Sequence, residues 1–174
     1  MKHGVPVAVM LFGYLLPATT VRAEPFDLSL GAAFAYGTTL DQNEKDGLGA
    51  SAYGALGLSD TMSLSLAGAF YEHSLGSGES YRLFNVGAGI LYNLDVLAIV
   101  PFAALRVGYL ARLGDGDGLL DGGLSLSVSV GFDYLVTEYL TAGLCAEYLG
   151  LLTSFDSFPA HAGFSLRLGI RLPH

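Results

Sequence analysis

The chain is poor in the residue types that several classes of protein require. It has one cysteine, Cys145, in 174 residues, which excludes an internal disulfide framework. Only 14% of its residues are charged, well below the roughly 25% that is usual in soluble domains. Lysine and arginine number 8 against 16 aspartates and glutamates, which gives a net charge of −8. Because there is no basic footprint, nucleic acid is excluded as a partner.

Long hydrophobic runs are also absent, although the composition is apolar. Hydrophobic residues make up 52% of the chain and the mean hydropathy is +0.50, values that suggest membrane helices. No apolar run, however, reaches the ~18 residues that a spanning helix needs, and 24 glycines are spread along the sequence. An apolar chain without a spanning helix has one other way to live in a bilayer, a closed barrel whose backbone groups all pair between strands.

The first residues have the pattern of a secretory signal peptide. Lys2 and His3 give a short basic start, residues 5–16 are apolar but too few to span a membrane, and Val21-Arg22-Ala23 offers small residues at the two positions that a signal peptidase reads. We therefore expect cleavage after Ala23, which leaves residues 24–174 as the mature domain. The alternative is an uncleaved anchor.

The mature part consists of segments in which two kinds of side chain alternate, each followed by a turn. The alternation is clearest in residues 124–134, where leucine, valine and aromatic residues hold the even positions and serine, glycine and Asp133 the odd ones. Such segments have the ~9–11 residues of a tilted strand that crosses a bilayer. The sequence predicts an all-β, closed, antiparallel, up-and-down transmembrane barrel of about eight strands. The strands are expected at 26–36, 48–58, 62–72, 82–92, 100–110, 124–134, 139–149 and 162–171.

Charge placement indicates which face of the sheet lies outward. The charged residues in the middle of these segments are Arg106, Asp133, Glu147 and Arg167, and all four share a face with serine, glycine and alanine. A soluble lipocalin-type barrel also alternates, but it needs a far more charged exterior. A wall that faces lipid must avoid charge, since arginine or lysine at the midplane costs ~2–4 kcal/mol. The pattern therefore favours lipid on the leucine-rich face and a narrow lumen on the other.

The connections fall into two groups that indicate sidedness. Those at 37–47, 73–81, 111–123 and 150–161 are longer and acidic, while those at 59–61, 93–99 and 135–138 are shorter. Small barrels have long extracellular loops and short periplasmic turns, so we expect the first group outside the cell. Aromatic residues near the strand ends match the interfacial girdles of such barrels. They are Phe26, Tyr36, Tyr92, Tyr109, Tyr134, Tyr139 and Tyr148.

Over residues 26–172 the chain resembles the small outer-membrane β-barrels of Gram-negative bacteria, the OmpA/OmpX type. The segments 131–135 (Gly-Phe-Asp-Tyr-Leu) and 139–144 (Tyr-Leu-Thr-Ala-Gly-Leu) are typical of a hairpin in these barrels. The resemblance implies export through the Sec pathway, insertion by the outer-membrane assembly machinery, contact with outer-membrane lipids and lipopolysaccharide, and no cofactor. The sequence departs from that family at Leu172-Pro173-His174, where such barrels commonly finish on an aromatic residue.

The first candidate site is a network of charges inside the barrel. Charges in a low-dielectric interior need partners, and closure of the barrel would bring Asp27 toward Arg171. One hypothesis is a salt-bridged plug that closes a narrow lumen, which we favour; the other is a gated, selective polar path. The network comprises Asp27, Arg106, Asp133, Glu147, Arg167 and Arg171.

The second candidate is the acidic segment that contains Asp115, Asp117 and Asp121. Carboxylates at this spacing can bind a divalent cation. An EF-hand would need an Asp or Asn at 119 and a Gly at 120, but both positions hold leucine, so that motif fails. We expect a solvated acidic turn and no metal site. The turn remains a candidate for contact with a surface partner or for a bridge to lipopolysaccharide through Ca²⁺ or Mg²⁺.

The third candidate is Glu72-His73-Ser74, with His161 as a second base near the outer rim. Some outer-membrane barrels are lipid-modifying hydrolases, and nucleophilic catalysis needs serine and histidine within hydrogen-bond reach. Adjacent residues on a strand point to opposite faces, so His73 and Ser74 are not expected to meet.

The sequence favours a non-enzymatic outer-membrane barrel with a structural or surface-interaction role and a plugged polar lumen. The alternatives are a small pore or transporter for a small solute or an apolar ligand and, third, a lipid-modifying hydrolase. Bulky residues expected inside a lumen this narrow favour the first of these, because an eight-stranded barrel has only enough interior for its side chains. They are Tyr53, Tyr71, Phe102 and Leu110. Cys145 is expected to face inward as an inert thiol.

Overall fold

The computed structural model describes residues 27–39, 44–75, 80–94, 98–114, 118–152 and 161–172. Within these ranges every regular element is a β-strand, and no helix among them is long and apolar enough to cross a membrane. The predicted signal peptide, Phe26, Asp115 and Asp117 lie outside the described residues.

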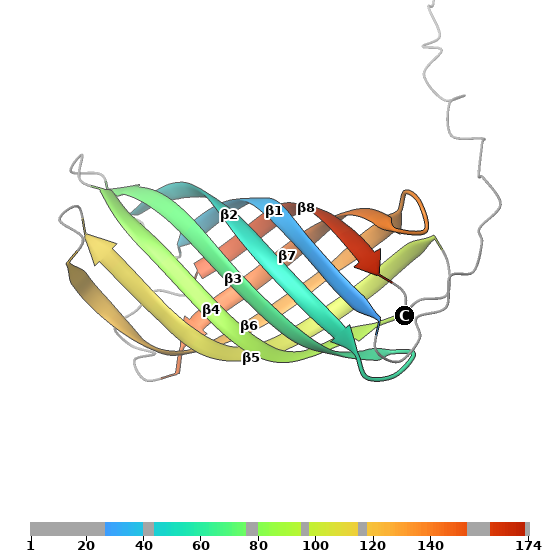
Figure 1. Cartoon of the computed structure of the whole chain (residues 1–174). Helices are drawn as coiled ribbons and strands as arrows, with labels where there is room; N and C mark the ends of the chain where they lie inside the picture. Colours follow the sequence, from blue (N-terminus) through green and yellow to red (C-terminus); the bar gives the residue numbers. More distant parts are fainter. Residues whose placement is uncertain are drawn as a thin grey trace, which may run out of the picture.

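The fold is a barrel of eight strands, each strongly tilted against the long axis (Figure 1). All eight predicted strands are present, so the predicted fold class is confirmed. The strands are β1 (Leu28–Thr39), β2 (Glu44–Gly57), β3 (Met62–Leu75), β4 (Ser80–Asn93), β5 (Ile99–Gly114), β6 (Leu119–Leu135), β7 (Leu140–Leu151) and β8 (His161–Leu172).

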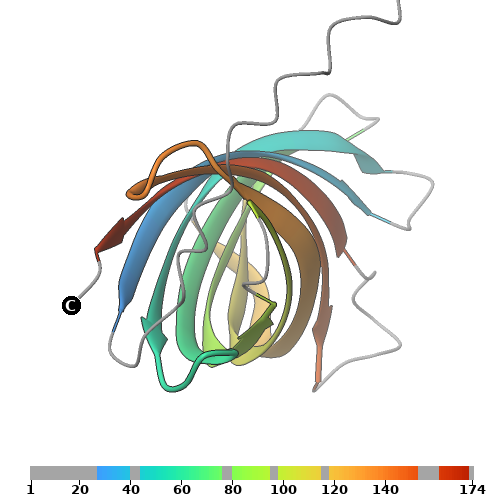
Figure 2. The same ribbon diagram turned by 90° about the vertical axis from the view of Figure 1, so that its right-hand side faces the viewer.

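Each strand pairs antiparallel with the next along the chain, and β1 pairs with β8 to close the sheet. The closing register runs from Leu28 opposite Leu172 to Thr39 opposite His161. Figure 2, turned by 90°, shows the strands wrapping around a central space. Where all eight strands pair, closure leaves no sheet edge with unpaired backbone groups, which is the condition for a sheet to lie in a bilayer.

The two ends of the barrel differ, and we name them by their connections. At the terminal end β1 begins, β8 ends, and residues 58–61, 94–98 and 136–139 connect neighbouring strands. At the loop end the connections are residues 40–43, 76–79, 115–118 and 152–160. Two turns at the terminal end share one design: the amide nitrogens of Met62 and Leu140 donate to the hydroxyls of Ser59 (3.1 Å) and Thr137 (3.0 Å).

The predicted difference in connection length is wrong for three of the four loop-end connections. The strands continue past their predicted ends, so 37–47, 73–81 and 111–123 shrink to 40–43, 76–79 and 115–118. Only residues 152–160 form a connection longer than those of the terminal end. The strands extend because backbone pairing does not need apolar side chains: Glu72 pairs with Arg82 and Arg112 with Asp121 beyond the apolar stretch.

Outward side chains in the middle of the strands are apolar, and many of them are large. Leu166 and Leu168 on β8 are each 63% exposed, and Phe34 on β1 is 59% exposed. Inward positions carry small, polar or charged residues together with the aromatic rings and leucines that fill the lumen, and Arg106 and Arg167 are buried there. The sequence-based assignment of the two faces, drawn from the confinement of charge, is confirmed by this burial pattern.

Candidate functional site: the barrel lumen

Inward glycines make room for the aromatic rings that fill the lumen. The Tyr53 ring lies against Gly31 on β1 and Gly169 on β8, where an added Cβ would overlap it. The Phe102 ring lies in the same way against Gly131, at 2.6 Å from an added Cβ. Phe102, Tyr71 and Leu110 are buried, as predicted. Tyr53 lines two small cavities in the lumen, one on each side of its ring. The inside of the barrel is therefore packed rather than open.

An arginine occupies the centre of the lumen and is held by three strands. Arg106 on β5 donates from Nε to the Ser65 hydroxyl (3.0 Å) and from Nη1 to the Ser129 hydroxyl (2.8 Å). The same Nη1 lies 3.3 Å from Oε2 of Glu147 on β7, and the Ser129 hydroxyl donates to that oxygen at 2.9 Å. The Arg106 and Glu147 side chains are only 6% and 18% exposed. This network ties β3, β5, β6 and β7 together across the interior.

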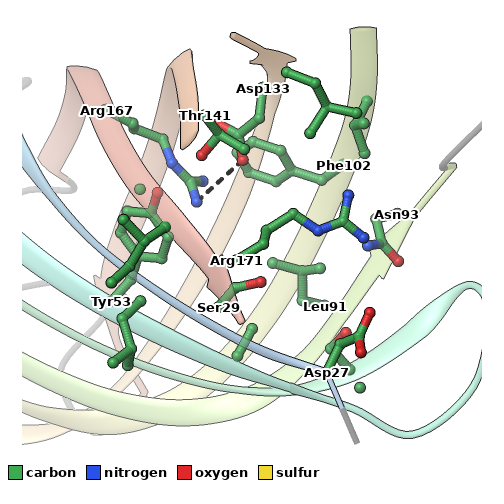
Figure 3. A pocket seen from close by; sticks show the side chains of 18 residues that line it. Asp27, Ser29, Tyr53, Leu91, Asn93, Phe102, Asp133, Thr141, Arg167 and Arg171 are labelled. Carbon is green, nitrogen blue, oxygen red and sulfur yellow. Dashed lines mark ion pairs between the residues drawn. The ribbon is translucent and has the colours of Figure 1, made fainter. Parts of the chain in front are cut away.

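A second arginine divides the lumen nearer the terminal end (Figure 3). The Arg167 guanidinium lies between the rings of Tyr53, at 3.8 Å from the centroid, and Phe102, at 4.3 Å. Its Nη2 pairs with Oδ2 of Asp133 at 3.4 Å. Arg167 and Tyr53 line both a cavity of about 70 Å³ that extends to the terminal end and a central cavity of about 40 Å³. The ring–guanidinium–ring stack is thus the partition between two small cavities, which we call the terminal cavity and the central cavity.

The terminal cavity also contains Asp27 and Arg171, which Figure 3 places on its lining. The barrel therefore brings the two residues to one cavity, as expected from the pairing of β1 with β8. Three buried polar atoms of this cavity, Oδ1 of Asp133, Oδ1 of Asn93 and Nε of Arg167, have no hydrogen-bond partner within the described ranges. Buried polar groups are normally satisfied, and a cavity of this size admits water.

The loop end of the lumen is closed by a set of side chains that sequence reasoning only partly foresaw. We call it the loop-end plug. It joins an apolar cluster to two histidines: His73 on β3 is 0% exposed and His161 on β8 is 1% exposed. The odd numbering of both histidines matches the inward positions of their strands, which is the only sequence signal for this arrangement. The apolar members are Ala35, Ala69, Tyr71, Tyr81, Leu83, Leu110, Leu149 and Leu151.

The predicted acidic site is represented by Asp121 alone among the described residues. Asp121 is exposed on β6, pairs in register with Arg112, and accepts a hydrogen bond from the Gly122 amide at 2.7 Å. Across the described ranges no group of three or more potential metal ligands comes together.

His73 and Ser74 do not meet, as expected from their adjacent positions on one strand. His73 is buried in the lumen, whereas Ser74 is exposed on the opposite face of β3. His161 lies inside the plug beside His73 rather than at an accessible rim. Cys145 faces inward and packs against Leu91, Phe102 and Ala104.

Tyrosines rim the apolar outer wall at both ends. Tyr92, Tyr134 and Tyr139 lie at the terminal end and are 45–55% exposed. Tyr36, Tyr109 and Tyr148 lie toward the loop end and are 40–52% exposed. This is the arrangement of aromatic girdles at the two interfaces of a bilayer.

No protein-family model matches the sequence, and no curated protein matches it. Solved structures do match the fold. The outer-membrane protein OprG from Pseudomonas aeruginosa is 12% identical, with a TM-score of 0.67 over 88% of this chain and 99% of that chain. Neisserial surface protein A is 19% identical, with a TM-score of 0.62 over 90% and 99%. Ail of Yersinia pestis is 14% identical, with a TM-score of 0.58 over 86% and 100%. The chain therefore has the fold of the small eight-stranded outer-membrane barrels.

Proposed function

We propose that this protein is an integral outer-membrane barrel with a closed lumen, which serves the cell envelope or its surface contacts rather than catalysis or constant transport. The observation that carries the proposal is that three barriers follow one another along the lumen: the loop-end plug, the Arg106–Glu147 network and the Arg167 partition. A barrel filled in this way acts through its outer wall and its rims.

The outer wall supports the membrane location. Outward residues from Phe164 to Leu172 on β8 are apolar, and outward charges such as Glu72 and Arg82 lie toward the loop end of their strands. Eight residues of tilted strand rise roughly 20 Å, close to the ~25 Å apolar band of such barrels. Lipid tails are the chemical partner for that band, and lipopolysaccharide is the partner that we propose for the polar rim above it. Insertion would use the outer-membrane assembly machinery.

The absence of an enzymatic role is part of the proposal. Ser74 and His73 lie on opposite faces of β3, and the two histidines of the described strands, His73 and His161, are enclosed by the plug. A hydrolase needs a nucleophile and a base within hydrogen-bond reach in an accessible place.

Two measurements on the same preparation test the proposal. Outer-membrane fractions should contain a species whose gel mobility changes on heating, as expected for a folded barrel. In planar bilayers at pH 7.5 the purified protein should show no steady conductance. A protein that is absent from the outer membrane, or one that conducts steadily at pH 7.5, would contradict the proposal.

A small pore is the second candidate function, because the terminal and central cavities follow one another along the lumen with only the Arg167 stack between them. Arg167→Ala would join the two cavities. Equal, silent recordings for the wild type and this variant, both inserted, would show that Arg167 is not the sole barrier to conduction. A conductance that appears only in the variant would favour the pore.

A further inference from the structure

Two histidines meet at the centre of the loop-end plug. The ring centroids of His73 and His161 are 5.3 Å apart, and the two planes are nearly perpendicular at 84°. Tyr81 stacks on His73, with centroids 5.0 Å apart and planes 7° from parallel, and the Tyr71 ring lies 4.5 Å from His161. We call these residues the four-ring cluster. They come from β3, β4 and β8, so the cluster bridges strands across the lumen.

The four-ring cluster is packed against the barrel wall and closes the lumen together with the leucines of the loop-end plug. An added Cβ at Gly47 would lie 2.7 Å from the His73 ring, and one at Gly37 would overlap the His161 ring. Tyr71 lines the central cavity, so the rings lie between that cavity and the loop end. Opening a path from the loop end to the central cavity therefore requires these rings to move.

Neutral rings suit this environment, whereas charged ones do not. Nε2 of His161 is buried and has no hydrogen-bond partner in the part of the chain that the structure describes. Arg112 already places a cation 3.8 Å from the centroid of the Tyr81 ring. The carboxylate of Glu147, on β7, is bound by Arg106 and Ser129. Among the described side chains, the remaining titratable groups around the cluster are Tyr71 on β3, Tyr81 on β4, Asp46 on β2 and Asp121 on β6, while the inward residues of β1 here, Ala35, Gly37 and Thr39, carry none.

We propose that the four-ring cluster is an acid-opened seal on the loop end of the lumen. Histidine is the side chain whose charge ordinarily changes between about pH 5 and pH 8. Protonation of both rings puts two like charges about 5 Å apart in a low-dielectric interior, where their repulsion is strong and each cation loses its hydration. Separation of the rings relieves both costs and admits water from the loop end.

The seal rests on the closed lumen of the proposed function. It adds to that closed state a second state of the barrel, which forms in acid. In acid the central cavity, with Arg106 and Glu147 on its wall, becomes accessible from the loop end. The Arg167 partition stays in place because its contacts do not involve the histidines. The expected change is therefore access to the central cavity.

Cys145 offers a native reporter of that access, because it lines the central cavity and is the only cysteine of the chain. A small, charged thiol reagent is added to protein in lipid vesicles, so that labelling through the apolar wall is excluded. Labelling rates are divided by those of the urea-unfolded protein at the same pH, which removes the pH dependence of the thiol itself. The Cys145→Ser variant gives the blank.

For the wild type we expect the normalised rate to rise at least tenfold from pH 7.5 to pH 5.5. The double variant His73→Phe/His161→Phe keeps the rings but cannot gain charge, so its rate should stay low at both values. At a constant pH of 7.5, His161→Lys should label faster than His161→Met, an uncharged side chain of similar length. Heat-modifiable gel mobility verifies folding of each variant.

The idea is overturned if the normalised wild-type rate is the same at both pH values, or if the double phenylalanine variant shows the same rise. The wild-type comparison stands even if His161→Lys does not fold. Fast labelling of the wild type already at pH 7.5 would instead contradict the closed lumen of the proposed function, so the two failures are distinguishable.

Discussion

At Gly31 the backbone of β1 lies against the ring of Tyr53 from the neighbouring strand. The same relation recurs between Gly131 and Phe102 and between Gly49 and Tyr71. An inward glycine beside an inward ring lets one large side chain use the space of two positions. In a lumen this narrow, this exchange explains why these inward strand positions hold glycine, which otherwise weakens pairing.

Gly31→Ala should destabilise the barrel, because the new methyl group would overlap the Tyr53 ring and lie 2.6 Å from the Leu168 carbonyl oxygen. Overpacking of this kind costs about 1–3 kcal/mol. Urea unfolding in lipid vesicles measures the change. Gly150→Ala is the matched control, since nothing lies within 4 Å of its added Cβ. Equal stability of the two variants would mean that the ring does not lie against Gly31.

Arg106 and Glu147 should show strong coupling in a double-mutant cycle. Removing either partner leaves a buried charge without its counter-ion, which costs about 3–5 kcal/mol. We therefore expect Arg106→Met and Glu147→Leu each to lower the free energy of unfolding by several kcal/mol, and the double variant to lose much less than their sum. Additive losses would show that the two side chains, 3.3 Å apart here, do not act as a pair.

The alternation of side chains along the strands predicts that the central charges face the lumen, but it does not predict the loop-end plug. Arg106, Asp133, Glu147 and Arg167 fall on the small-residue face in the sequence and lie inside the barrel. The contact between His73 and His161 depends on the stagger of β3 against β8 across the lumen, which no local pattern encodes. Alternation predicts which face of the sheet a residue lies on. The distance between two residues across the lumen depends also on the register of the closed barrel.

At the scale of the strands, the alternation of apolar and polar side chains predicts only the part of each strand that faces lipid. β5 runs to Gly114 and β6 begins at Leu119, well past the predicted ends at 110 and 124. The outward residues there need not be apolar once the strand leaves the hydrocarbon, so alternation of hydrophobicity stops while backbone pairing continues. This is why the number and order of strands were predictable and the loop-end boundaries were not.

Depth along β8 should control the cost of an outward charge. Leu166 lies midway along the strand and is 63% exposed on the outer wall, whereas Leu172 lies at the terminal end. In a bilayer, Leu166→Arg should cost about 2–4 kcal/mol and Leu172→Arg about 0–1 kcal/mol. Urea unfolding in vesicles measures both. If the two substitutions cost the same, the wall of β8 does not cross a bilayer; Leu166→Ala controls for the lost side chain.

At the scale of the whole molecule, the barrel has an even number of strands, and the pairing of β1 with β8 closes it. One of its connections, residues 152–160, is long. β1 begins and β8 ends at the terminal end, and the connections between strands at that end are short. Barrels of this kind keep short turns in the periplasm and direct longer loops outward. We therefore expect the loop end, with its histidine plug, to face the cell surface.

A tag inserted between β7 and β8 should test this orientation, because residues 152–160 form the longest connection of the loop end. In intact Gram-negative cells the tag should bind antibody, whereas the same tag within 136–139 should bind only after the outer membrane is opened. Both insertions lie outside the strands and leave the closing register of β1 and β8 unchanged. The reverse pattern would place the loop-end plug in the periplasm, where its acid response would sense the inside of the envelope instead of the medium.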